Sequence, residues 1–154
     1  MADVRTLITE YLEAAKLMQL ATVNNNKPWC CSVWFAADDE LNLYWLSSVK
    51  RRHSREVSEN ASVAGAIVVP HFPSNPPRGI QFEGQAHAVT DPKEQETAVK
   101  IYAGRIYPES KIQSFMTDTE RPHNFYKVVV KAYVLFDVVN FPGDPRQELQ
   151  LGTE

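Results

Sequence analysis

The sequence is poor in glycine and cysteine, and these shortages remove several classes of site. Its 154 residues contain six glycines and two cysteines. No Gly-x-Gly-x-x-Gly, Walker or Gly-x-Ser-x-Gly motif is present, so the common nucleotide-binding loops and the hydrolase nucleophile elbow are excluded. There is no Cys-x-x-Cys or His-x-x-x-His pair, so the sequence supports no metal site. Cys30 and Cys31 are adjacent in a strand-like run, which favours two reduced thiols over a disulfide.

A strong excess of charge and long apolar runs are also missing. Sixteen Lys and Arg against nineteen Asp and Glu give a net charge of −3, which argues against a general nucleic-acid or membrane-surface binder. The longest apolar run, Val63 to Val69, is far shorter than the roughly 20 residues of a membrane span. The chain opens with no secretory segment. We therefore expect a cytoplasmic protein with neither a nucleic-acid nor a membrane partner.

Hydrophobic periodicity predicts one mainly β domain spanning residues 1–154. A proline-rich stretch at 70–77 reads as a loop, and a polar tail from about residue 142 is expected to be mobile. The last predicted strand is long enough to be one bent strand or a hairpin. The predicted helices are 4–15, 50–60, 91–102 and 109–115, and the predicted strands are 18–23, 29–36, 41–46, 62–69, 79–90 and 125–139.

The most distinctive chemistry lies in the run from Lys50 to Arg55, which places four permanent cations in six residues of an acidic protein. At the start of a helix each cation costs about 0.3–1 kcal/mol, and a bound phosphate reverses that cost. The alternatives are a solvated helix face paired with Glu56 and Glu59, or a nucleic-acid contact. Aromatic runs at 32–35 and 43–47 precede the basic run. They favour either a phosphorylated aromatic ligand or an ordinary aromatic core.

The order of these segments resembles a known family, the FMN-binding split barrels related to pyridoxamine 5'-phosphate oxidase. The resemblance covers about 130 residues. Within that superfamily, the sequence is most similar to a small bacterial branch. No single motif is specific; their order and spacing carry the match. The segments are Ala21-Thr22-Val23, Lys27-Pro28, Ser32 to Phe35, Leu43 to Ser47, Lys50 to His53, Asn60 to Ala64 and Arg78 to Gly84.

The resemblance implies an antiparallel split β-barrel of the Greek-key type that forms a homodimer, with an FMN in each of two grooves between the subunits. Arg52 and His53 occupy the positions of the family's phosphate-binding pair, and Ser47 matches a small hydroxyl residue that contacts the cofactor. No catalytic acid or base is indicated. The implied cofactor-binding residues are Cys31, Ser32, Val33, Trp34, Trp45, Leu46, Ser47, Lys50, Arg51, Arg52, His53 and Gln81.

Two departures from the family pattern limit what the resemblance implies. His53 replaces the usual lysine, so its phosphate contact is expected to weaken as the pH rises through neutrality. Residues 141–146 do not match the C-terminal Trp and Arg region that serves vitamin B6 substrates, so true pyridoxamine 5'-phosphate oxidation is not expected. The function expected is an FMN-dependent oxidoreductase with an unknown small-molecule substrate. The alternatives are a non-catalytic flavin-binding or sensing module, or a split barrel that binds a deazaflavin, haem or a B6 compound.

Overall fold

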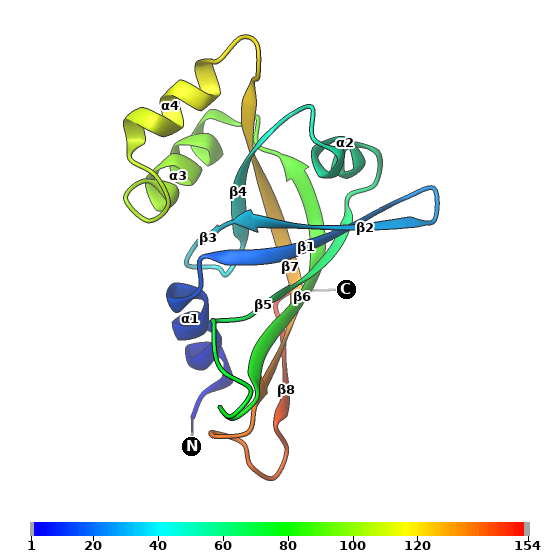
Figure 1. The fold of residues 1–154 in the computed structure, drawn as a ribbon, viewed down its shortest axis with the longest axis vertical. Coiled ribbons are helices and arrows are strands. Elements are labelled where there is room, and N and C mark those ends of the chain that lie inside the picture. The colour runs from blue at the N-terminus through cyan, green and yellow to red at the C-terminus, as the bar shows by residue number, and fades with distance from the viewer. Residues whose placement is uncertain (1, 153–154) are drawn as a thin grey trace.

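A single antiparallel sheet organises the computed structural model, which describes residues 2–152 (Figure 1). Its strands follow the order β2-β1-β5-β6-β7-β4-β3, and β8 pairs with β7. All the pairings between these strands are antiparallel, as expected for a split β-barrel. The strands are β1 Leu17–Asn24, β2 Lys27–Trp34, β3 Ala36–Ala37, β4 Leu43–Ser48, β5 Ser62–Ile67, β6 Arg78–Ala88, β7 His123–Asp137 and β8 Arg146–Gln150.

In the described part of the chain, residues 2–152, four helices pack around the sheet, close to the predicted positions. The side chains of Asp3 and Asp91 cap α1 and α3 by accepting the backbone N–H of Thr6 and Glu94, a standard way to satisfy a free helix donor. Figure 1 shows α3 and α4 side by side at one end of the molecule, with α2 beside the β1–β2 hairpin. The helices are α1 Val4–Ala14, α2 Arg52–Glu59, α3 Pro92–Tyr102 and α4 Glu109–Thr117. None of the helices in residues 2–152 is long and apolar enough to cross a membrane.

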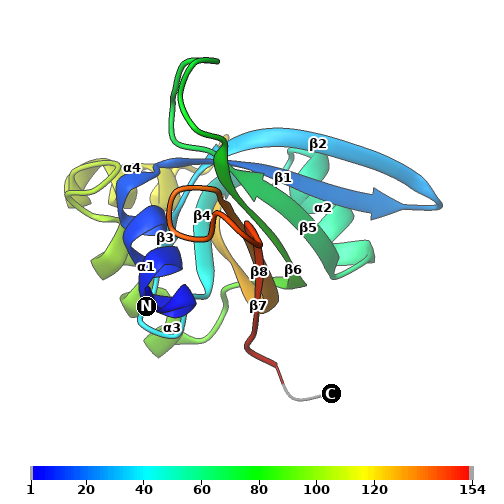
Figure 2. The ribbon, with the colours of Figure 1, turned by 90° about the horizontal axis from the view of Figure 1, so that it is seen from below.

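The β1–β2 hairpin is tighter than predicted. Asn25 and Asn26 have φ angles of 50° and 60°, the left-handed conformation that a two-residue turn of twisted strands requires. Because the turn takes only these two residues, β2 already begins at Lys27 and pairs there with Asn24. The hairpin extends from the body of the molecule in both views (Figures 1 and 2).

The C-terminal segment corrects one prediction. The polar tail was expected to be mobile, but residues 146–150 form β8 and pair with β7 from Ala132 to Phe136. Their alternation explains the pairing, because Gln147 and Leu149 are half-buried whereas their neighbours are exposed. The mobile-tail prediction is therefore wrong. The preceding strand, β7, is one continuous strand of 15 residues and not a hairpin.

The sheet has one face on the core and one face open to solvent. Side chains such as Leu20, Phe82 and Tyr133 are buried on the core face. We call the other side the exposed face. The strand registers align one row of residues across it from β2 to β8. This row is Ser32, Gln19, Ala66, Gln81, Val134 and Glu148.

Candidate functional site

The basic run lies where the sequence predicted it, at the start of a helix. Helix α2 begins at Arg52, two residues later than expected, and Arg51 is its N-cap residue. No side chain caps this end and its first turn contains no acidic residue. The first N–H groups of any helix lack partners inside the helix, so this end has unused donors next to exposed cations. Lys50 donates from Nζ to the Glu120 carbonyl oxygen at 3.1 Å, which fixes the adjoining loop.

Arg52 is held in place by two other side chains, Glu56 and Trp29. Its Nε donates to Glu56 Oε1 at 2.9 Å, and its guanidinium carbon lies 4.0 Å from the centre of the Trp29 ring. The second Glu56 oxygen accepts the hydroxyl of Thr22 at 2.5 Å. This hydrogen bond, together with Arg52, holds the pKa of the Glu56 carboxyl below its usual range. Within residues 2–152 neither terminal nitrogen of Arg52 has a hydrogen-bond partner.

Sequence reasoning identified Arg52 and considered Glu56 only under the alternative of a solvated helix face. The spacing of four residues did indicate the Arg52–Glu56 pair. The burial of Glu56 depends on Thr22, which is 34 residues away in the sequence and lies on the core face of β1. Trp29 was likewise missed because its role depends on β2 running beside α2. No local pattern signals these two contacts.

His53 lies in a different environment from its neighbour Arg52. It is buried, and its Nε2 lies 2.7 Å from the hydroxyl oxygen of Ser47, which links α2 to β4. Burial lowers the pKa of the imidazole, and the nearby charge of Arg51 lowers it further. The ring is therefore neutral at neutral pH. This geometry does not favour the cationic phosphate contact that the sequence predicted for His53.

The predicted ring-lining residues of β2 divide between the two faces of the sheet. Cys31 and Val33 pack against the core, whereas Ser32 and Trp34 lie on the exposed face. Burial raises the pKa of the Cys31 thiol to about 11, so it is not a thiolate at neutral pH. Gln81 is also on the exposed face, in the row with Ser32. Within a single chain, Gln81 and Arg52 therefore lie on opposite sides of the sheet.

The predicted residues of β4 are mostly buried. Trp45 is fully buried and stacks on Tyr126, with ring centres 5.1 Å apart and planes 16° apart. Its side chain forms part of the core and has no free surface for a ligand. Leu46 packs against the cluster under α3 and α4. Ser47 reaches α2 through its hydrogen bond with His53, and the neighbouring Ser48 carbonyl oxygen accepts the hydroxyl of Ser54 at 2.8 Å.

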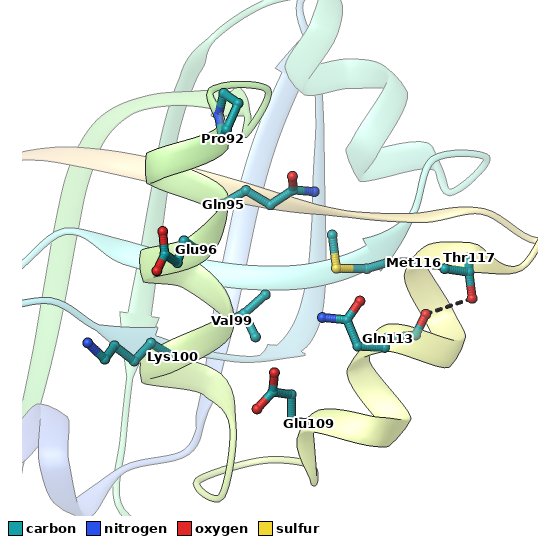
Figure 3. Close-up of a pocket in the computed structure, with 9 residues that line it drawn as sticks. All are labelled: Pro92, Gln95, Glu96, Val99, Lys100, Glu109, Gln113, Met116 and Thr117. Atoms are coloured by element: carbon teal, nitrogen blue, oxygen red, sulfur yellow. Dashed lines mark hydrogen bonds between the residues drawn. The ribbon is translucent and has the colours of Figure 1, made fainter.

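Two large hollows lie beside the helices. One, of about 620 Å³, lies between α3 and α4, with Val99, Gln113 and Met116 in the space between them (Figure 3). Lys100 is the one cation of that lining, and none of the predicted residues lies there. The other hollow, of about 800 Å³, adjoins the basic run and is lined by Ser48, Lys50, Arg51, Phe115, Asp118, Glu120, Arg121 and His123. Within residues 2–152, no group of three or more His, Cys, Asp or Glu side chains is arranged to hold a metal ion.

Two curated bacterial proteins are similar in sequence to this chain. The chain is similar to a UPF0306 protein of Cronobacter sakazakii, at 25% identity over 113 residues, 73% of this chain and 77% of that protein. A UPF0306 protein of Pasteurella multocida is 28% identical over 80 residues, so the match spans about half of each chain, 51% and 54%.

Solved structures share the fold. A putative pyridoxamine 5'-phosphate oxidase of Listeria innocua matches with a TM-score of 0.65 at 20% identity, over 86% of this chain and 98% of that chain. A heme binding protein of Mycobacterium smegmatis gives 0.71 at 15% identity, over 92% and 57%. A FAD-binding protein of Mesorhizobium loti gives 0.64 at 15% identity, over 85% and 90%.

The family itself follows from the sequence match. The family model described as pyridoxamine 5'-phosphate oxidase matches residues 5–132, from the first turns of α1 into β7. This range includes the basic run, the residues that contact Arg52 and all the strands from β1 to β6. The chain therefore belongs to the pyridoxamine 5'-phosphate oxidase family of split barrels.

Proposed function

We propose that the protein binds FMN and that the start of α2 holds the FMN phosphate. The observation that carries this proposal is Arg52, whose guanidinium is fixed at Nε while its two terminal nitrogens have no hydrogen-bond partner among residues 2–152. A guanidinium edge of this kind matches the spacing of two phosphate oxygens. The uncapped N–H groups of α2 and the exposed Arg51 supply further donors and positive charge at the same place.

FMN, if bound, would supply hydride or electron transfer, which is the chemistry of an oxidoreductase. The chain's own part is to bind the phosphate and to orient the ring. His53 is buried and hydrogen-bonded to Ser47, and the Cys31 thiol keeps its proton, so neither is assigned as a catalytic base for the second substrate. Turnover of a reduced nicotinamide with a dye acceptor by the FMN-loaded protein separates an enzyme from a non-catalytic flavin-binding module.

A comparison of FMN with riboflavin tests the phosphate site. Riboflavin has the same ring and lacks the phosphate, so flavin fluorescence titrations isolate the phosphate contribution. We expect Arg52→Ala to weaken FMN binding about tenfold or more, because charge-assisted hydrogen bonds contribute about 1.5–3 kcal/mol. Riboflavin binding should change little. Arg55→Ala removes the same charge from an exposed position of the same helix and is the control. Equal losses for both flavins would contradict the proposal.

A second copy of the chain completes the proposed site. Trp34, Val68, Val129 and Phe136 are each 40–46% exposed and all project from the exposed face. Large apolar side chains gathered on one face are typical of an interface between proteins. The predicted cofactor residues Ser32, Trp34 and Gln81 lie on this same face. A homodimer that covers this face places Ser32, Trp34 and Gln81 at the subunit boundary.

Haem is the second candidate ligand because of His123. Its Nδ1 lies 2.7 Å from the Arg121 carbonyl oxygen, which leaves Nε2 free to ligate iron. The 800 Å³ hollow beside it is lined by Lys50, Arg51 and Arg121, whose charges suit propionates, and also by Asp118 and Glu120, which oppose them. One structural neighbour is a heme binding protein. A haem titration followed by absorbance at the Soret band tests this site. If His123 ligates the iron, the shift of the Soret band seen with the wild type should be lost in His123→Ala. His71, which has a similar carbonyl contact at 2.8 Å, is the control.

A further inference from the structure

We infer that Glu56 is a positioning residue for the anion site. Together with Thr22, it holds the Arg52 guanidinium against the Trp29 ring, so that the two terminal nitrogens of Arg52 remain available to bind an anion. This inference rests on the proposed FMN site and adds the residue that prepares it. Glu56 itself touches no ligand in this account. It acts through Arg52.

The contacts of Glu56 use both of its carboxylate oxygens. One accepts Arg52 Nε at 2.9 Å and the other accepts the Thr22 hydroxyl at 2.5 Å. Both Glu56 and Thr22 are buried, with 6% and 3% of their surface exposed. A buried carboxylate is costly unless its oxygens are paired, so this arrangement keeps a charged group at a position where α2 packs on β1. The carboxylate is thereby fixed with respect to the sheet.

A fixed carboxylate fixes the arginine. The guanidinium is planar, so a hydrogen bond at Nε and a ring below its face together define both its position and its plane. Trp29 supplies that ring, from the neighbouring strand. What remains free is the edge formed by the two terminal nitrogens, the edge that binds a phosphate in two places. Within residues 2–152, Arg51 and Arg55 have no side-chain ion pair, so Arg52 is the arginine of this run that the fold orients.

Positioning and simple charge make opposite predictions for Glu56. Its negative charge alone repels a phosphate, so a purely electrostatic role means that any neutral replacement tightens FMN binding. Glu56→Gln separates the two roles because an amide can keep both hydrogen bonds. Its oxygen accepts Arg52 Nε, and its NH2 donates to the Thr22 hydroxyl. Glu56→Ala removes both bonds.

The test measures FMN and riboflavin affinity for these variants. We expect Glu56→Ala to weaken FMN binding about tenfold with little effect on riboflavin, and Glu56→Gln to stay within about threefold of the wild type. In an Arg52→Ala background, Glu56→Ala should cause no further loss, since the two residues act as one unit. Thr22→Val should weaken FMN binding in the same direction. Glu59→Ala, an exposed acid of the same helix, is the matched control. Urea unfolding of each variant confirms that it is folded.

Several results would overturn the inference. Tighter FMN binding by both Glu56 variants would assign a role in charge alone. Equal losses of FMN and riboflavin, or additive losses in the double variant, would assign a structural role. Exchange of the Arg52 Nε proton with water, followed by 15N NMR without ligand, tests the positioning directly. It should be slow in the wild type and Glu56→Gln but fast in Glu56→Ala. Fast exchange in the wild type refutes the role of Glu56. A wild type that exchanges slowly but does not hold FMN refutes the proposed function alone.

Discussion

At the start of α2, burial gives two neighbouring residues different charges. Arg52 keeps 39% of its side chain exposed and carries a charge at every accessible pH. His53 is buried against Ser47, and its pKa is lowered because burial disfavours the imidazolium form. The cation available to a ligand at this site is therefore Arg52. His53 instead joins α2 to the end of β4.

The lowered pKa of His53 makes stability depend on pH in one direction. Above the ordinary value of 6.5, the imidazole is neutral in the folded and the unfolded chain, so it adds no pH dependence. Below 6.5, the unfolded chain takes up the proton first, and the free energy of unfolding falls until the lowered folded-state pKa is reached. We expect urea midpoints to decline from pH 7 to pH 5 more steeply for the wild type than for His53→Asn. Equal declines would contradict a buried neutral His53.

The same group governs the expected pH profile of FMN binding. A neutral His53 gives up no proton between pH 7 and 8.5, so FMN affinity should stay constant over that range. The sequence alone predicted a decline, from a protonated His53 in contact with the phosphate. Titrations at both ends of the range distinguish the two. A decline that disappears in His53→Asn would restore the phosphate contact.

What the sequence could predict at this scale was local. Asp91 was identified as a helix cap from the four residues Asp-Pro-Lys-Glu, and its side chain does accept the Glu94 N–H. The burial of Glu56 was beyond such reasoning, whereas a core position for Trp45 was one of the two alternatives that the sequence left open. An aromatic residue in a strand is equally typical of a core and of a ligand pocket. Tertiary packing decides which of the two it joins.

At the scale of elements, Arg105 fastens the end of α1 to the rest of the fold. Its guanidinium donates to the carbonyl oxygens of Leu12 at 2.8 Å, Glu13 at 3.1 Å and Phe35 at 3.2 Å, and also to that of Ala15. The last carbonyl groups of a helix lack partners inside the helix and carry its negative end. One side chain from the loop after α3 thus satisfies the end of α1.

Removal of Arg105 should lower stability measurably. We expect Arg105→Ala to reduce the free energy of unfolding by about 3 kcal/mol, because several charge-assisted hydrogen bonds are lost and half-buried carbonyls are left without donors. Arg105→Lys keeps the charge but not the planar fork, so it should recover only part of this loss. Urea unfolding measures both. Arg5→Ala, with one exposed contact at 3.3 Å, is the control; a comparable loss there would count against this role.

The long β6–β7 pairing depends on a glycine at its irregularity. The register shifts between Glu83 and Gly84, and a Cβ at position 84 would lie 2.3 Å from the Val129 carbonyl oxygen. That atom belongs to the backbone of a paired strand and has little room to move. We expect Gly84→Ala to cost about 3 kcal/mol in urea unfolding. Gly143→Ala, where nothing lies within 4 Å, should be close to neutral. Equal effects would contradict the close approach.

At the scale of the whole molecule, the predicted fold was right and its C-terminal edge was not. The split barrel was predictable because alternating strands and capped helices are local patterns that agreed with the family resemblance. Strand β8 was missed because residues 146–150 are polar on one side and follow two prolines. They form a strand because β7 offers them an edge to pair with. That edge is a property of the assembled sheet.

The exposed face predicts the oligomeric state. We expect light scattering at micromolar concentration to give twice the chain mass of 17.5 kDa. Replacement of both Trp34 and Phe136 by Glu should shift the mass to one chain, because two charges would be buried in an apolar interface. Val139→Glu, at a residue 64% exposed just beyond β7, is the control and should leave the mass unchanged. A monomeric wild type would contradict the homodimer.

The most direct test of the central claim is the visible spectrum of the purified protein after soaking with FMN and desalting. The account predicts flavin bands at about one flavin per chain for the wild type and for Arg55→Ala, and near-complete loss of the bands for Arg52→Ala. A colourless wild type would contradict the assignment of an FMN phosphate to the start of α2. It would also contradict the oxidoreductase function, which depends on bound FMN.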